Sequence, residues 1–288
     1  MAAKPEMQEQ RITAADGGVF GLTRVRPAEN VSGRGQVIYI PGMFSGRSFW
    51  LSDKGIGLAA CMAEAGYAGW IVERRGMGLA GPVARRGPRQ GLVEHIRYDL
   101  PLVQKMVAEQ GSGPVYWVGH SLGGVVLTQA VAQSLDQQQV AGMVLFATQC
   151  EQSVASLTPP LGLMLKLAVR LLGRLPAGRF APGPLDEPAP AVVDACDWTT
   201  AACRSPDFLA QLAAIKVPVL ALVGAGDESD PPTGCRQFAE RFGSKNRTFL
   251  VAGTETGFSE DFSHAGIVVS RAARQEIWPL FRAWVHRH

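Results

Sequence analysis

The stretch YWVGHSLGGVV, residues 116–126, decides the fold because a strand pattern meets a helix pattern there with almost nothing between them. Tyr116 to Val118 are typical of a buried strand, and residues 122–135 have the composition of a helix. The chain must therefore turn sharply at Ser121, in a backbone conformation that is costly for a residue with a side chain. Proteins keep such strain mainly where function uses it, so Ser121 is the first candidate for a functional residue.

The residues around Ser121 favour an exposed nucleophile over an ordinary turn. They read Gly119-His120-Ser121-Leu122-Gly123, and a side chain at either glycine would collide inside so tight a bend. The bend lifts the Ser121 hydroxyl into open space and aims the backbone N–H of Leu122 at the oxygen of a bound carbonyl. The alternative is a glycine-lined turn in which the serine only caps the helix, and the strand–turn–helix context disfavours it.

Strand and helix patterns alternate on both sides of this turn. The strand-like runs are residues 36–40, 67–72, 115–119, 140–147, 217–224 and 247–251, and a turn at 16–18 predicts a β-hairpin before them. Short apolar strands separated by helices indicate an α/β fold with a mainly parallel sheet and helices on both faces. Functional side chains then gather at the carboxyl edge of the strands.

One long interval interrupts the alternation. Residues 151–216, called the insertion below, separate two strands and contain no convincing strand of their own. An interval of this length is usually a lid or a binding element, so we expect a helical cap on a core of residues 1–150 and 217–288. Within it, LGLMLKLAVRLLGRL (161–175) predicts an amphipathic helix that packs over the site or contacts a lipid surface or acyl chain.

A serine hydroxyl becomes a good nucleophile when a base takes its proton and an acid orients the base. His264 is the preferred base, because its loop lies between the last strand and the last helix and can reach back over the sheet edge to Ser121. The other histidines are less suitable as the base. His120 lies inside the turn, where its side chain should point away from Ser121, and His95 is interpreted as a solvated residue at a helix start. His286 and His288 belong to the C-terminal tail.

The orienting acid is expected just after the strand at 217–224. Asp227 lies three residues beyond Gly224, at the carboxyl edge, and is preferred. Asp230 is its rival, although a carboxylate before two prolines can serve only to fix a turn. Asp261 is a weaker rival, with the surroundings of a solvated loop carboxylate. Asp99 is interpreted as a helix cap.

These residues resemble those of the α/β-hydrolase superfamily of serine hydrolases, over most of residues 20–288. Ser121, Asp227 and His264 occur in the family order of nucleophile, acid and base. The resemblance implies that residues 40–44 form the oxyanion loop, with the backbone N–H of Met43 as the second donor beside that of Leu122. In this chain Pro41 replaces the histidine that is common in that loop, while Gly42 is retained.

Two other patterns do not predict a cofactor. Residues 76–81 have the G-x-G-x-x-G spacing of a dinucleotide-binding turn, but Pro82 and loop composition follow where a helix is required. Residues 73–78 instead resemble the acidic–x–Arg–Gly–x–Gly loop of many α/β-hydrolases, which is mainly structural. The five scattered cysteines form no C-x-x-C pair, so no metal site is expected.

The resemblance implies an enzyme that hydrolyses a carboxylic ester with an apolar acyl group, through a Ser-His-Asp triad and an acyl-enzyme. A thioesterase, an acyltransferase, a C–C bond hydrolase and a non-catalytic small-molecule binding protein remain alternatives. A net charge of +3 without a basic block gives no sign of nucleic acid. We expect no membrane span, because no stretch reaches about 18 uncharged apolar residues. We expect a cytoplasmic location, because the polar N-terminal residues lack a signal-peptide core. The oligomeric state stays open.

Overall fold

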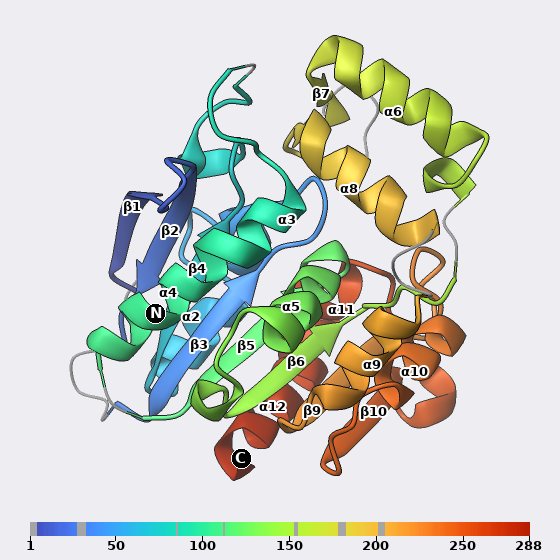
Figure 1. Ribbon diagram of the computed structural model, residues 1–288. Coiled ribbons are helices and arrows are strands. Elements are labelled where there is room, and N and C mark those ends of the chain that lie inside the picture. Colours follow the sequence, from blue (N-terminus) through green and yellow to red (C-terminus); the bar gives the residue numbers. More distant parts are fainter. Residues whose placement is uncertain are drawn as a thin grey trace.

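The computed structural model describes residues 5–27, 33–84, 86–111, 113–152, 155–177, 183–200 and 205–288. In this part of the chain, eight strands form one central sheet in the order β1-β2-β4-β3-β5-β6-β9-β10, with helices on both faces (Figure 1). The strands are β1 (Met7–Thr13), β2 (Val19–Val25), β3 (Gly35–Ile40), β4 (Tyr67–Glu73), β5 (Val115–His120), β6 (Gly142–Phe146), β9 (Val219–Gly224) and β10 (Arg247–Ala252).

Strand directions follow from the connections. From β4 through β10 all neighbours pair in parallel, because each strand is joined to the next by a helical crossover. β2 pairs antiparallel with both β1 and β4, and the β1–β2 hairpin predicted from the sequence is present. The predicted mainly parallel sheet is confirmed, and the carboxyl ends of its parallel strands share one edge.

The helices cover the two faces of this sheet and form the insertion. They are α1 (Arg47–Trp50), α2 (Leu58–Glu64), α3 (Leu92–Glu94), α4 (Leu100–Glu109), α5 (Leu122–Gln133), α6 (Leu161–Leu172), α8 (Ala189–Thr200), α9 (Pro206–Ala214), α10 (Pro232–Glu240), α11 (Gly266–Val269) and α12 (Arg271–Arg287). None of the helices in the described ranges combines the length and hydropathy that crossing a bilayer requires.

The sheet separates two apolar cores, and β5 contributes to both. Successive side chains of a strand point to opposite faces. Trp117 is therefore buried on the face of α4, α5 and α9, whereas Tyr116 and Val118 are buried on the face of α2 and α12. Burial on both sides explains why the strands around the nucleophile are almost continuously apolar rather than alternating.

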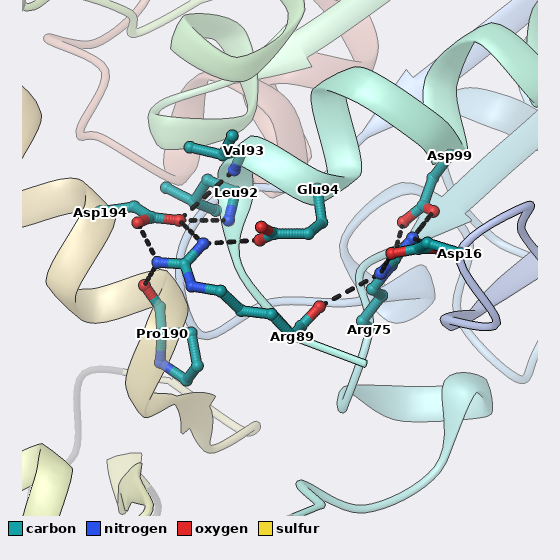
Figure 2. A network of polar contacts seen from close by, with 9 residues as sticks. All are labelled: Asp16, Arg75, Arg89, Leu92, Val93, Glu94, Asp99, Pro190 and Asp194. Carbon is teal, nitrogen blue, oxygen red and sulfur yellow. Dashed lines mark hydrogen bonds and ion pairs between the residues drawn. The ribbon is translucent and has the colours of Figure 1, made fainter. Parts of the chain in front are cut away.

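Two interpretations at the start of α4 are wrong. His95 is fully buried rather than solvated, and Asp99 makes no capping hydrogen bond. The Asp99 carboxylate instead accepts from Arg75 Nη2 at 2.6 Å and from His95 Nδ1 at 2.8 Å. Arg75 also reaches Asp16 of the hairpin turn, as Figure 2 shows. This buried cluster joins the hairpin, the loop after β4 and the single π-helical turn His95–Asp99 that precedes α4.

The described part of the insertion contains the helices α6, α8 and α9 and also the two-residue strand pair β7 (Arg174–Leu175) and β8 (Glu187–Pro188), although the sequence predicts no strand there. α6 and α8 lie side by side away from the sheet in Figure 1 and share a small apolar cluster. α9 packs instead into the core beside α5, through Phe208 and Leu212.

An ion-pair network attaches α8 to the body of the protein (Figure 2). The Asp194 carboxylate on α8 pairs with Arg89 and accepts the backbone N–H of Leu92 at 2.8 Å. Glu94 pairs with the same arginine at 2.6 Å. The carboxylate of α8 therefore binds the first residue of α3, where helix N–H groups have no partner in their own helix.

Candidate active site

Ser121 sits in the strained turn that the sequence predicts, between β5 and α5. Its backbone has φ 53° and ψ −128°, a conformation that a residue with a side chain rarely adopts. A Cβ at Gly119 would lie 2.5 Å from the Cα of Gly124, and one at Gly123 would lie 2.5 Å from the carbonyl oxygen of Pro41. No side chain fits at either position, so the glycines are what permits the turn.

His264 is brought to Asp227 by the loop after β10. The imidazole Nδ1 lies 2.9 Å from Asp227 Oδ2 and 3.1 Å from Oδ1. Asp227 is buried, and its Oδ1 also accepts the backbone N–H groups of Ser229 and Asp230, each at 2.9 Å. These contacts fix the carboxylate, and with it the orientation of the imidazole.

The rival acids lie elsewhere. Asp230 Oδ1 accepts from Gln149 Nε2 at 2.9 Å, and its Oδ2 faces Ser121 rather than Nδ1 of the imidazole. Asp261 accepts from the backbone and hydroxyl of Thr254 on an exposed loop. Of the three carboxylates considered from the sequence, Asp227 is the one against His264.

The pKa values of this group follow from burial and charge. Burial by itself would lower the pKa of His264, but the hydrogen bond and charge of Asp227, together with the charge of Asp230, outweigh it and raise that pKa. Burial raises the pKa of Asp230 to about 6, against the opposing effect of His264. Asp230 therefore titrates close to neutral pH.

The Ser121 hydroxyl has a long hydrogen bond, 3.5 Å, to Asp230 Oδ2. Across the described ranges no hydrogen bond joins it to His264, although both residues line the same cavity. The contact between a nucleophile and its base is often long before a substrate is in place. The structure thus brings Ser121, His264 and Asp227 to one place and adds Asp230 to them.

His120 has a role that the sequence analysis missed. It is buried beneath the base, with its Nε2 2.9 Å from the backbone oxygen of His264 and the two ring centroids 4.7 Å apart. Burial, and then the charge of His264, lower the pKa of His120 to about 3, so the ring is neutral and its Nε2–H donates to that oxygen. The sequence offered one sign of this role: His120 is the last residue of the buried strand that leads to Ser121, where a polar side chain needs a hydrogen-bond partner.

The two residues whose backbone N–H groups are expected to bind an oxyanion, Leu122 and Met43, both line the cavity at Ser121. A Cβ on Gly42 would come within 3.2 Å of the Ser121 Cβ and 3.0 Å of His120 Nδ1. The loop after β3 can approach the turn this closely because residue 42 has no side chain, and the substitution of proline for histidine at Pro41 does not prevent it.

A cavity of about 810 Å³ opens over Ser121 and extends under the insertion. Its far wall is apolar, with Leu157, Leu165, Leu175 and Trp198. Its near end carries the polar groups Ser121, His264, Asp230 and Glu228. A mainly apolar cleft of this size with few polar groups at one end is typical of a small-molecule site.

The glycine-rich loop after β4 binds a carboxylate of the protein itself. Glu73 Oε2 accepts from the N–H of Leu79 at 3.0 Å, and its Oε1 accepts from that of Arg47 at 2.8 Å. A Cβ at Gly78 would lie 2.1 Å from Glu73 Oε1. The loop therefore encloses Glu73 and leaves no cradle for a phosphate. In the described residues, no three His, Cys, Asp or Glu side chains are arranged to hold a metal ion.

Comparisons with known proteins give a matching family model and several solved structures of similar fold. Residues 52–195 match the model of a family described as "Serine aminopeptidase, S33" (Hydrolase_4). A search of curated protein sequences gives no match. A soluble variant of monoglyceride lipase from Saccharomyces cerevisiae, in complex with a substrate analog, aligns at a TM-score of 0.75 with 16% identity, covering 100% of this chain and 96% of that one.

Two further solved structures are similar to nearly the whole chain. A thermophilic esterase from Thermogutta terrifontis has a TM-score of 0.66 and 18% identity, covering 97% of this chain and 98% of its own. A monoacylglycerol lipase from Paleococcus ferrophilus has a TM-score of 0.62 and 17% identity with the same coverage. The predicted α/β-hydrolase fold is confirmed.

Proposed function

This chain belongs to the serine aminopeptidase S33 (Hydrolase_4) family, and from that premise we propose that it is a serine hydrolase of carboxylic esters with an apolar acyl group. The observation that carries the proposal is the contact of His264 Nδ1 with the buried Asp227, on the wall of the apolar cavity that Ser121 also lines. A pocket that only bound its ligand would gain nothing from an oriented base beside a strained serine.

In the proposed mechanism His264 donates its Nδ1–H to Asp227, which leaves Nε2 to take the proton of Ser121. The serine oxygen attacks the ester carbonyl, and the oxyanion receives the backbone N–H groups of Leu122 and Met43. Collapse expels the alcohol, which takes the proton from His264. Water, deprotonated by the same nitrogen, then attacks the acyl-enzyme; the bond to the Ser121 oxygen breaks, this oxygen takes the proton back from His264, and the acid is released. No step requires a metal or an organic cofactor.

The shape and charge of the cavity support the substrate class. Leu157, Leu165 and Trp198 offer an apolar wall to an acyl chain. Glu228 and Asp230 at the polar end disfavour anionic substrates by charge repulsion. The similar structures are described as monoglyceride lipases and an esterase, which favours a neutral ester over a peptide or a thioester.

A fluorophosphonate probe tests the enzyme assignment first. Stoichiometric labelling of Ser121 that is lost in His264→Ala supports catalysis by the proposed machinery. Well-folded protein that takes up no label would instead favour a non-catalytic binding protein.

A substrate panel then tests the ester assignment. It contains p-nitrophenyl esters of increasing acyl length, acyl-CoA thioesters, and aminoacyl p-nitroanilides, which address the peptidase name of the family. We expect ester hydrolysis with a preference for short to medium chains. Activity confined to the anilides would refute the proposal, and activity confined to the thioesters would assign a thioesterase. Acyl transfer is distinguished by adding glycerol and measuring the ester formed.

The exposed face of α6 supports contact with a lipid surface. Leu163, Met164, Leu167 and Leu171 are 58%, 67%, 62% and 72% exposed, an apolar stripe that one helix presents to solvent. We propose that it rests on the surface from which an apolar ester enters the cavity. Sedimentation with phosphatidylcholine vesicles tests this, since the double substitution of Leu167 and Leu171 by serine should abolish binding. If the double variant binds the vesicles as well as the unchanged protein does, α6 is not the lipid-binding surface.

We propose the cytoplasm as the location, because the five cysteines do not form the pattern of a disulfide framework. Fractionation of cells that express the chain would test this.

A further inference from the structure

Phe44, at the end of the oxyanion loop, is held in a strained conformation by the insertion. Its φ is 60°, in the left-handed region that non-glycine residues rarely occupy. Its N–H donates to Glu187 Oε1 at 2.6 Å, and its carbonyl accepts the N–H of Leu185 at 3.1 Å. Glu187 is 143 residues away in the sequence. The segment just before α8 therefore fixes both polar groups of this residue.

Arg74, at the end of β4, holds the same loop from the other side. Its Nη1 donates to the carbonyl oxygens of Pro41 at 3.2 Å and Gly42 at 3.3 Å. Its Nη2 forms an ion pair with Glu187 Oε1, the oxygen that also receives the N–H of Phe44. Both side chains are almost completely removed from solvent.

The two side chains leave one donor of the loop unused. Arg74 occupies the carbonyls that precede Met43, and Glu187 occupies the N–H that follows it. None of the hydrogen bonds in the described part of the chain uses the N–H of Met43 itself. The Met43 N–H belongs to the same planar peptide group as the Gly42 carbonyl that Arg74 binds, so its orientation is fixed together with that carbonyl.

Stability alone does not account for this ion pair. Taking two charges out of water is costly, and apolar side chains of similar volume often replace such a pair without loss of stability. Here Oε2 of Glu187 is buried with no hydrogen bond to any described residue, which adds to the cost. A pair retained at a cost, in contact with the loop beside the nucleophile, points to a role in function.

We propose that Arg74 and Glu187 are positioning residues for the oxyanion hole: together they hold the loop so that the Met43 N–H faces the developing oxyanion. This inference rests on the proposed ester hydrolysis. It makes the insertion part of the catalytic apparatus, because Glu187 comes from it. A displacement of the segment before α8 would turn the loop and remove one of the two donors.

The double variant Arg74→Met with Glu187→Leu tests this, because it removes both charges and leaves no buried ion uncompensated. Complete loss of one oxyanion donor costs about 10²- to 10³-fold in kcat. A donor that is present but misoriented should cost about 10- to 100-fold in kcat, with KM nearly unchanged, because the contact forms only in the transition state. The affinity of an alkyl trifluoromethyl ketone, a transition-state analogue, should fall by the same factor.

Single variants separate positioning from packing. Glu187→Gln keeps an oxygen acceptor for the N–H of Phe44 and should retain more kcat than Glu187→Ala. The matched control is Asp194→Asn, which weakens another attachment of the insertion to the body of the protein, away from the oxyanion loop (Figure 2). It should lower Tm, because Asp194 is buried, while kcat stays within about twofold, because its contacts are with Arg89 and Leu92 and not with the oxyanion loop.

A folded double variant with wild-type kcat would overturn the inference, and so would an equal loss of kcat in Asp194→Asn. Should the double variant not fold, Glu187→Ala decides instead: kcat and analogue affinity must fall together, and unchanged values overturn the proposal. Fluorophosphonate labelling of the wild type distinguishes a failure of the positioning role from a failure of the proposed ester hydrolysis. Labelled wild type with an unaffected variant refutes only the positioning role, whereas unlabelled wild type refutes ester hydrolysis at Ser121.

Discussion

Replacing Asp227 by asparagine should nearly abolish hydrolysis while the fold survives. The carboxylate receives Nδ1–H of His264 at 2.9 and 3.1 Å, and its side chain is fully buried. An asparagine Oδ1 can still accept the backbone N–H groups of Ser229 and Asp230, so the loop should keep its course. The amide NH₂ would donate to Nδ1, however, and the proton would then sit on Nε2, which could not accept one from Ser121.

The expected loss is about 10⁴-fold in kcat, the typical cost of a wrong tautomer in such a triad. At about 1.36 kcal/mol for each factor of ten, this corresponds to about 5.4 kcal/mol of transition-state stabilisation. Hydrolysis of p-nitrophenyl butyrate measures it, with Tm as the check on folding.

Asp230→Asn is the matched comparison, because Asp230 lies in the same loop but bonds Gln149 and Ser121 rather than Nδ1. Its kcat should fall by about tenfold or less, because the contact with Ser121 is long, 3.5 Å, and an ordinary hydrogen bond contributes about 0.5–1.5 kcal/mol. The reasoning fails if Asp227→Asn stays within tenfold of the wild type, or if Asp230→Asn is the more damaging change.

Three other outcomes follow from the same geometry. His264 must be neutral to act as the base, and its pKa is raised, so kcat/KM should increase with pH through a midpoint above 6.5. Asp230→Asn removes one of the charges that raise this pKa, so the midpoint should move to lower pH; an unchanged midpoint would contradict the assigned cause. Gly119→Ala places a Cβ 2.5 Å from the Cα of Gly124, so it should lower the free energy of unfolding by about 1–3 kcal/mol and reduce fluorophosphonate labelling of Ser121. A variant with unchanged Tm and unchanged labelling would contradict the tight turn. Asp99→Ala takes one of two carboxylates from the buried Arg75, which keeps its pair with Asp16, and should cost about 1.5–3 kcal/mol in urea unfolding, so a loss below about 1 kcal/mol would argue against the pair.

What the sequence determined by itself is local. The turn at Ser121 could be predicted because the glycines that permit it are its neighbours in the chain, and the parallel sheet because apolar runs of strand length alternate with helical ones. The positions of His264 and Asp227 after the last strands also predict that they lie close together, since the carboxyl ends of parallel strands meet at one edge. These inferences need only short-range sterics and a rule of topology.

What only the tertiary structure decided are the contacts between segments far apart in the sequence. Asp227 and Asp230 are three residues apart and have the same chemistry. The course of their loop in the folded protein determines that Asp227 contacts the imidazole and Asp230 faces Ser121. The sequence position of His95 predicts a solvated residue, but in the structure it is fully buried with its Nδ1 2.8 Å from Asp99 Oδ2. Glu187 carried no signal, because its reason for being buried is a backbone N–H 143 residues away. A buried charge depends on partners that folding brings together, and no local pattern encodes them.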